Sequence, residues 1–192
     1  MPLLRVTHTK GAFTDAERDA LAEEFTHAIL IGEIGADNEV ARSVAYLQFV
    51  ELDAANGGWY VGGKREANPP KGGRMILDVF YPVGAADQSA KTELHRALSV
   101  AIGDVLGVDV SFPNRPQDWI FVHEIPEGNW GISTRTVGVE TIHAFTQGDP
   151  ARVPFQQALL AAQGRVRAEF DFPEGAPGEG RPSPLLELEA AE

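Results

Sequence analysis

The feature that most constrains this chain is an internal repeat. Moving the sequence along by 73 residues places 6–29 on 79–102 without a gap. Identical pairs in this window include Val6/Val79, Gly11/Gly84, Leu21/Leu94, Ala28/Ala101 and Ile29/Ile102. Further along, the offset becomes 72 and Phe49-Val50 meets Phe121-Val122. Because self-similarity at a fixed offset indicates a repeated structural unit, the chain is predicted to fold from two tandem units.

Each unit has the pattern of a strand, a helix and a second strand. Apolar extended runs open the units at 2–7 and 74–81, and second runs follow at 43–52 and 118–125. The first helix is predicted to begin at Thr14, because Thr14-Asp15-Ala16-Glu17 has the spacing of a capping box. Apolar residues in both helical segments recur on one face: Leu21, Phe25, Ala28 and Ile29, then Leu94, Leu98, Ala101, Ile102 and Val105.

These patterns predict an α+β fold of two tandem β-α-β units. A helical crossover joins parallel strands with a right-handed connection. Two units side by side then give a four-stranded mixed sheet with two helices on one face, and a partner subunit is expected to cover the other face. The predicted boundaries are 2–64 for the first unit, 65–73 for a linker, 74–147 for the second unit and 148–192 for a C-terminal helix, starting at Phe155, and a Pro/Gly/Glu-rich tail.

Composition narrows the classes of partner and cofactor. The net charge of −12 disfavours nucleic acid, because a phosphate backbone would repel the protein. There is no cysteine, no apolar run long enough for a membrane span and no signal-peptide pattern at the amino terminus, so a cytoplasmic protein is expected. Metal-ligand spacings are absent, and Arg65 stands where a phosphate loop needs Ser or Thr after Lys64. No cofactor or metal is expected.

A proline directly after the initiator Met opens the first predicted strand, and aromatic-glycine segments end each unit at 59–63 and 130–132. With these features, residues 2–135 resemble the tautomerase superfamily, which includes 4-oxalocrotonate tautomerase and macrophage migration inhibitory factor. The doubled length is similar to the fused members, typified by cis-3-chloroacrylic acid dehalogenase. The segment WYVGGK at 59–64 resembles a branch of oxalocrotonate tautomerase-like proteins. The resemblance implies a homotrimer.

The resemblance also implies that Pro2 is the catalytic residue once Met1 is removed. A free α-amino group has a pKa of roughly 8, and burial lowers it by disfavouring the charged form. The neutral amine then serves as a general base that moves a proton α to a carbonyl. Met75 occupies the matching place in the second unit, so one such site per chain is expected.

The substrate-binding candidates are less well defined than Pro2. The family's anion-binding arginines have no counterpart in 82–91, so Lys10, in the loop after the first strand, and Arg135, after the second aromatic-glycine segment, are the candidate cations for a small anionic substrate. Trp130 either lines the pocket or anchors its hairpin in the core. His27 lies close to the position of the dehalogenase's helical histidine but is offset, and Phe121 stands at the position of its tyrosine.

Two functions from different classes remain open at this point. The first is a cofactor-free tautomerase-like enzyme that acts on a small 2-oxo or enol carboxylic acid with Pro2 as the base. The alternative is a non-catalytic binding or assembly protein that retains the fold. Hydratase or dehalogenase activity ranks lower, because most of the dehalogenase's residues are replaced.

Overall fold

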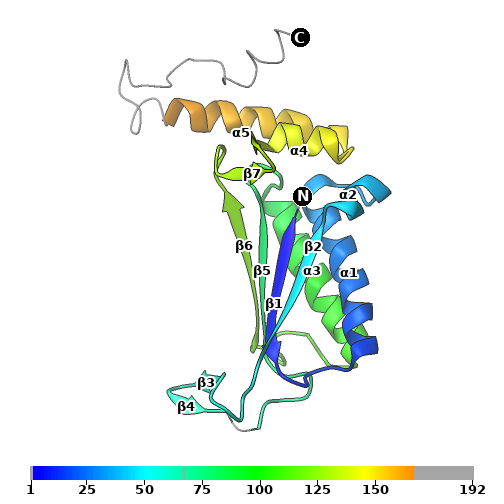
Figure 1. Cartoon of the computed structure of the whole chain (residues 1–192), viewed down its shortest axis with the longest axis vertical. Helices are drawn as coiled ribbons and strands as arrows, with labels where there is room; N and C mark the ends of the chain where they lie inside the picture. The colour runs from blue at the N-terminus through cyan, green and yellow to red at the C-terminus, as the bar shows by residue number, and fades with distance from the viewer. Residues whose placement is uncertain (1, 67, 167–192) are drawn as a thin grey trace.

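The computed structural model describes residues 2–66 and 68–166. Four strands form one sheet in the order β2-β1-β5-β6: β1 (Leu3–Thr9), β2 (Tyr46–Leu52), β5 (Met75–Pro82) and β6 (Asp118–Ile125). The pairs β1–β2 and β5–β6 are parallel, whereas β1 and β5 are antiparallel. Helices α1 (Asp15–Ile34) and α3 (Gln88–Leu106) cover one face of the sheet (Figure 1). The predicted fold, a mixed four-stranded sheet with two helices on one face, is confirmed.

The remaining elements gather at the two ends of the sheet. At the end where β1 and β2 finish lies the hairpin of β3 (Tyr60–Val61) and β4 (Lys64–Arg65) (Figure 1). A second hairpin, β7 (Trp130–Ile132) and β8 (Arg135–Val137), follows the end of β6. Helices α4 (Val139–Phe145) and α5 (Val153–Val166) lie across this opposite end of the sheet, joined by the 3-10 turn η1 (Pro150–Arg152) (Figure 1).

Local sequence signals explain where the helices begin. The Thr14 backbone N–H donates to Glu17 Oε2 at 2.7 Å, and the Glu17 N–H donates to Thr14 Oγ1 at 3.2 Å, so the capping box is present. The second predicted strand starts later than 43, because Asn38 caps the short helix α2 (Glu39–Ser43) by accepting from the Ala41 N–H at 2.9 Å. Only the part of the predicted C-terminal helix up to 166 lies within the described residues.

The core lies between the sheet and the two long helices. Alternate residues of β1 and β5 face the helices and are buried: Leu4, Val6, Met75, Leu77 and Val79. The predicted helical faces meet them with Leu21, Phe25, Ile29, Leu94, Leu98 and Ile102. Burial of each of these large side chains contributes roughly 2 kcal/mol. The repeat therefore encodes two copies of one apolar layer that pack into a single core.

The other face of the sheet is open in the single chain. Its residues alternate with the core residues along each strand, and several are large and exposed: Tyr46 at 66%, Trp119 at 57%, Phe121 at 45% and Val50 at 38%. Arg5 lies over the Phe80 ring, with its guanidinium carbon 5.9 Å from the ring centroid, and Phe80 stacks on His123. This aromatic-rich surface, defined as the open sheet face, lies opposite α1 and α3.

Candidate active site

Pro2 is buried at the point where β1 begins. Its carbonyl oxygen accepts a 3.0 Å hydrogen bond from the Tyr46 N–H, which fixes it to the start of β2. In the antiparallel pairing of β1 with β5, Leu3 stands opposite Phe80. One further step of the same register brings Pro2 beside Tyr81. The amino terminus of the first unit therefore lies beside the end of β5, the strand that precedes α3 in the second unit.

Tyr81 follows Phe80 on β5, at the position that the extended register places opposite Pro2. Its side chain is fully buried, and its hydroxyl has no hydrogen-bond partner in the part of the chain that the structure describes. Burial raises the pKa of Tyr81 well above its usual range, and the negative charges of Glu124 and Glu33 act in the same direction. The phenol thus stays neutral and keeps its O–H as a hydrogen-bond donor.

Glu33, in the last turn of α1, is a fully buried carboxyl group at the same end. Burial raises its pKa, and the positive charges of the chain's amino terminus and of Arg152 oppose that rise. A carboxyl group is seldom buried in this way unless it is paired or has a function. No sequence pattern pointed to Glu33, because the helical periodicity alone does not distinguish a buried acid from a surface one.

Arg152, in the C-terminal segment, contacts the end of α1 near Glu33. Its Nη1 donates to the carbonyl oxygens of Gly32 at 2.6 Å, Glu33 at 3.1 Å and Ala85 at 3.2 Å, and its Nη2 donates to that of Ile31 at 2.7 Å. These contacts satisfy carbonyl groups at the end of α1. Arg152 lies beyond the part of the chain that resembles the tautomerases, so the resemblance could not identify it.

A second cation, Lys91 near the start of α3, also lies at this end. Its Nζ contacts Glu124 Oε2 at 2.6 Å, and Glu124 pairs with Tyr81 across β5 and β6. The two side chains are 20% and 29% exposed. Lys91 is the last residue of 82–91, the segment in which the resemblance implies anion-binding arginines. A lysine in that segment is therefore the sequence signal for this cation.

Lys10 and Pro2 are not brought together within one chain. Lys10 follows the far end of β1, so the strand rise of about 3.3 Å per residue puts them roughly 25 Å apart. The Lys10 side chain is 63% exposed and lies 3.8 Å from Asp53. Within a single chain Lys10 therefore forms part of the opposite end of the sheet.

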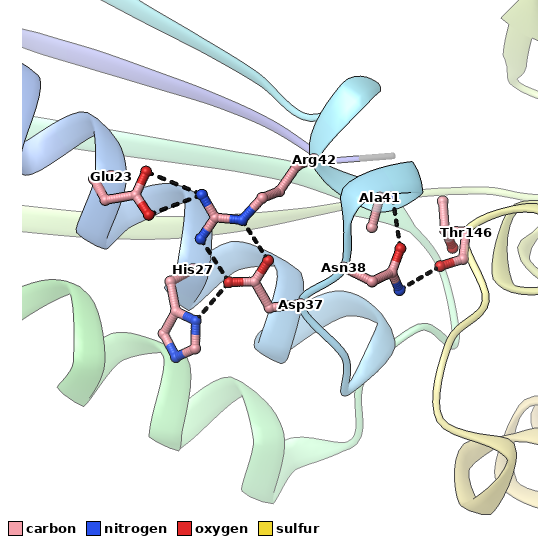
Figure 2. Close-up of polar contacts among 7 residues, drawn as sticks. All are labelled: Glu23, His27, Asp37, Asn38, Ala41, Arg42 and Thr146. Atoms are coloured by element: carbon pink, nitrogen blue, oxygen red, sulfur yellow. Dashed lines mark hydrogen bonds and ion pairs between the residues drawn. The ribbon is translucent and has the colours of Figure 1, made fainter.

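His27 lies on the outer surface of α1, away from the sheet. Its side chain is 56% exposed, and Nδ1 lies 2.8 Å from Asp37 Oδ2. Asp37 also accepts two hydrogen bonds from Arg42, whose Nη1 reaches Glu23 (Figure 2). The pKa of Asp37 is lowered to about 2, first by the hydrogen bonds from Arg42. His27 thus belongs to a surface charge network, and it also lines a cavity between α1 and α3 that Arg152 borders.

The three other predicted site residues divide between two places. Phe121 lies on the open sheet face, with its ring 6.1 Å from that of Trp119. Trp130 and Arg135 belong to the β7–β8 hairpin, where Ile132 pairs with Arg135. This hairpin follows the end of β6 (Figure 1), and the registers of β1, β5 and β6 bring Pro2 to the same end of the sheet. In one chain, then, Trp130 and Arg135 share an end of the sheet with Pro2, and Phe121 shares the face that a partner would cover.

A metal-binding cluster and a membrane-spanning helix are both absent from the described ranges, 2–66 and 68–166. There, no cluster of three or more His, Asp or Glu side chains is arranged to ligate a metal ion. In the same ranges, none of the helices combines the length and apolar character that crossing a membrane requires.

Comparisons with known proteins identify the fold through structure alone. No family model matches the sequence, and no curated relative matches it. A solved structure of N1, a member of the cis-3-chloroacrylic acid dehalogenase family, is 20% identical, with a TM-score of 0.58 over 83% of this chain and 99% of that one. Native fused 4-OT is 23% identical, with a TM-score of 0.55 over 70% and 94%. Pt0534, inactivated by 2-oxo-3-pentynoate, is 16% identical, with a TM-score of 0.55 over 73% and 98%.

These matches show that the chain has the tautomerase-superfamily fold, in the fused two-unit form. The matched structures are almost wholly covered, whereas part of this chain has no counterpart in them.

Proposed function

We propose that the protein is a cofactor-free, tautomerase-like enzyme that moves a proton on a small 2-oxo or enol carboxylic acid. Pro2, freed by removal of Met1, is the general base. The observation that carries this proposal is the burial of Pro2 at the start of β1, one residue before the pairing of Leu3 with Phe80. Burial favours the uncharged amine, which is the form that accepts a proton near neutral pH.

In the proposed reaction the amine takes a proton from the carbon next to the substrate carbonyl. The C–H electron pair becomes part of an enolate, and the resulting ammonium group returns the proton to another atom of the same substrate. The reaction is an isomerisation and consumes no co-reactant. Positive side chains are needed to bind the substrate carboxylate and to stabilise the enolate charge.

Cations for this role are available in two ways. Arg135 and Lys91 lie at the Pro2 end of the same chain. Lys10 would come from another copy, because it lies at the opposite end of β1. Fused 4-OT structures are described as trimers, which supports a homotrimer here and a site shared between copies. Trp130, His27 and Phe121 stay predicted substrate contacts in such an assembly.

The alternative is a non-catalytic binding or assembly protein, and one observation favours it. Two cations at the Pro2 end of the sheet are engaged within the chain: Lys91 contacts Glu124, and Arg152 donates to main-chain carbonyl groups. A substrate carboxylate would have to compete with such contacts or use a cation from a partner copy. Hydration or dehalogenation within the same fold stays the lower-ranked option, although N1 belongs to a dehalogenase family.

The test begins with the intact mass of tag-free protein, which establishes that Met1 is absent. Ketonisation of an enol-form 2-oxo acid such as phenylenolpyruvate is then followed by ultraviolet absorbance. Pro2→Ala should lower kcat/KM by at least about tenfold, since loss of a positioned base costs roughly 10²–10⁴ and the new terminal amine restores part of it. Pro70→Ala, at an exposed linker proline, is the matched control and should leave the rate unchanged.

A second measurement identifies the reacting nitrogen. Because Pt0534 was inactivated by 2-oxo-3-pentynoate, the same reagent is a suitable probe of a nucleophilic terminal amine. One adduct per chain, mapped to Pro2 by fragmentation mass spectrometry, is expected for protein that lacks Met1. Folded, Met1-free protein that neither accelerates ketonisation nor forms this adduct would favour the binding-protein alternative.

A further inference from the structure

We propose that the seam between α1 and α3 is a docking groove for a basic amphipathic helix of a partner protein. The seam lies on the helical side of the fold, opposite the open sheet face, so it is separate from the surface that the predicted trimer would cover (Figure 1). Apolar side chains of the partner would lie on the floor of the groove, and its lysine or arginine side chains along the acidic rim. The groove does not depend on the proposed function, because Pro2 is not among the residues that line it.

Two neighbouring cavities run along the seam. The first has a volume of about 630 Å³ and the second of about 350 Å³, and both are lined by Arg96 and Ala97 of α3. Helix α1 contributes His27 and Ile31 to the first cavity and Glu24 to the second. The two cavities therefore form one elongated groove between the helices, which is the shape in which an amphipathic helix is bound.

Large apolar side chains are exposed along this groove. Ile31 of α1 and Phe155 of α5 line the first cavity, and Val100 of α3 lines the second. The floor between them is apolar as well: Ala28, Gly32, Ala90, Leu94, Ala97 and Ala101. Because all three exposed side chains belong to helices, a copy seated on the open sheet face would leave them in contact with water. Apolar groups around a concave surface with a polar rim are typical of a site that binds another protein.

The charges around the groove define the chemistry of the partner. The lining carries four carboxylates against two guanidinium groups: Glu24, Asp87, Glu93 and Asp104, against Arg96 and Arg152. Arg96 Nε contacts Glu93 Oε2 at 2.8 Å, and Arg152 donates to main-chain carbonyl groups. The rim is therefore acidic, and the net charge of the whole chain is −12. Lysine and arginine side chains are the groups that such a field attracts.

His27 adds a positioned hydrogen-bond acceptor to the rim. Its Nδ1 lies 2.8 Å from Asp37 Oδ2, and Asp37 accepts from Arg42 at 2.6 and 2.7 Å (Figure 2). The carboxylate of Asp37 holds the proton on Nδ1, so Nε2 of the neutral ring is an acceptor. Figure 2 shows Nε2 on the side of the ring away from Asp37, and His27 lines the first cavity. A lysine, arginine or amide side chain of the partner can donate to this nitrogen.

The same charges disfavour two other occupants of the groove. A second copy of this helical face would bring one acidic rim against another. The chain's own residues 184–192, PLLELEAAE, combine three leucines with three glutamates, so they too would bring negative charge to the rim. Like charges across an interface oppose association, whereas a basic helix is attracted to this rim.

The experiment measures the binding of defined peptides to the full-length protein. The probe is a fluorescein-labelled leucine–lysine peptide of about 18 residues, close to the length of α3, with its leucines on one helical face. The same peptide with glutamate in place of lysine is the comparison. Fluorescence anisotropy at roughly 0.15 M salt, where long-range attraction is screened, should give at least about tenfold tighter binding for the lysine peptide.

Two pairs of matched variants locate the binding. Val100→Ser in the groove should weaken binding of the lysine peptide about fivefold, whereas Val61→Ser, at an exposed valine of β3, should leave it unchanged. Asp104→Lys on the rim should also weaken it about fivefold. Asp19→Lys, the same charge change at an exposed acid on α1, should weaken it about twofold at most. All four residues are exposed, so the variants should keep the fold.

Equal losses in the groove variants and their controls would show non-specific attraction to an acidic protein and overturn the proposal, as would failure of the lysine peptide to bind. Tighter binding of the glutamate peptide overturns it in favour of an acidic occupant such as 184–192. A lower assembly mass for Val100→Ser than for the wild type, measured by light scattering, overturns it in favour of a second copy. Because none of these readouts follows turnover, an inactive protein that binds the lysine peptide would defeat the proposed function alone.

Discussion

Arg152 donates a 2.6 Å hydrogen bond from Nη1 to the carbonyl oxygen of Gly32, a residue 120 positions earlier in the chain. This contact joins the C-terminal segment to the end of α1, on the turn that carries Glu33. The approach is close: a Cβ added at Gly35, which caps α1 in the left-handed conformation, would lie 2.8 Å from Arg152 Nε. The C-terminal segment is therefore built into the Pro2 end of the fold.

Arg152→Leu is expected to lower the free energy of unfolding by about 2 kcal/mol, because the substitution leaves helix carbonyl groups without their charged donor. Urea unfolding followed by circular dichroism measures the change. Arg96→Leu is the matched control, since Arg96 is 66% exposed and pairs with the equally exposed Glu93 three residues earlier. Its effect should stay within about 0.5 kcal/mol. Equal losses in the two variants would contradict the structural role of Arg152.

Phe121→Glu is expected to dissociate the predicted homotrimer. Phe121 lies at 45% exposure on the open sheet face, and a charge there would be costly to bury against another copy. Light scattering on purified protein should give the mass of three chains for the wild type and of one for the variant. Val100→Glu, at an exposed apolar position on α3, should stay trimeric. A monomeric wild type would refute the trimer.

Acidification is expected to destabilise the protein through His8. Its side chain is buried, the Nδ1–H donates to the Thr9 carbonyl at 3.0 Å, and burial lowers its pKa. Because the folded chain holds the neutral form, the unfolded chain binds the proton more readily, and stability is lost as the pH falls below 6.5, the ordinary value. Between pH 7.5 and 5.5 the loss should be about 1 kcal/mol.

The control for this prediction is His8→Phe, which removes the titrating group and keeps a ring against Phe13, now 4.3 Å from His8 between ring centroids. The pH dependence of its urea unfolding should be flatter than that of the wild type. An identical dependence in both proteins would assign the acid sensitivity to other groups.

Arg42→Gln is expected to raise the pKa of Asp37 from about 2 towards its ordinary value of 3.8, because the Arg42 hydrogen bonds are the largest cause of the shift. Carboxyl 13C shifts followed by NMR against pH measure it. His27→Gln should have a smaller effect, since His27 contributes less. With its folded pKa lowered, Asp37 stabilises the fold fully above 3.8, and this stabilisation is lost as the pH falls through about 2. A larger shift in His27→Gln would contradict the order of these contacts.

The sequence by itself determined the elements and their duplication. Apolar runs at 2–7, 43–52, 74–81 and 118–125 set four strands, and helical spacing within 6–29 and 79–102 set two helices. Thr14 with Glu17 set the start of α1, because such patterns act between residues a few positions apart. Repetition of the unit then required one sheet with both helices on one face. The family resemblance pointed to Pro2, and its burial is consistent with that role.

Only the tertiary structure decided which side chains surround Pro2. The antiparallel junction of β1 with β5 brings Tyr81 beside it, places Lys10 at the far end of the same strand, and leaves His27 on the outside of α1. Arg152 reaches the end of α1 from a segment with no repeat partner. Local periodicity fixes the face on which a residue lies, whereas the chain topology fixes which distant ends meet. For that reason a sequence can predict the sheet but not the site that forms at its edge.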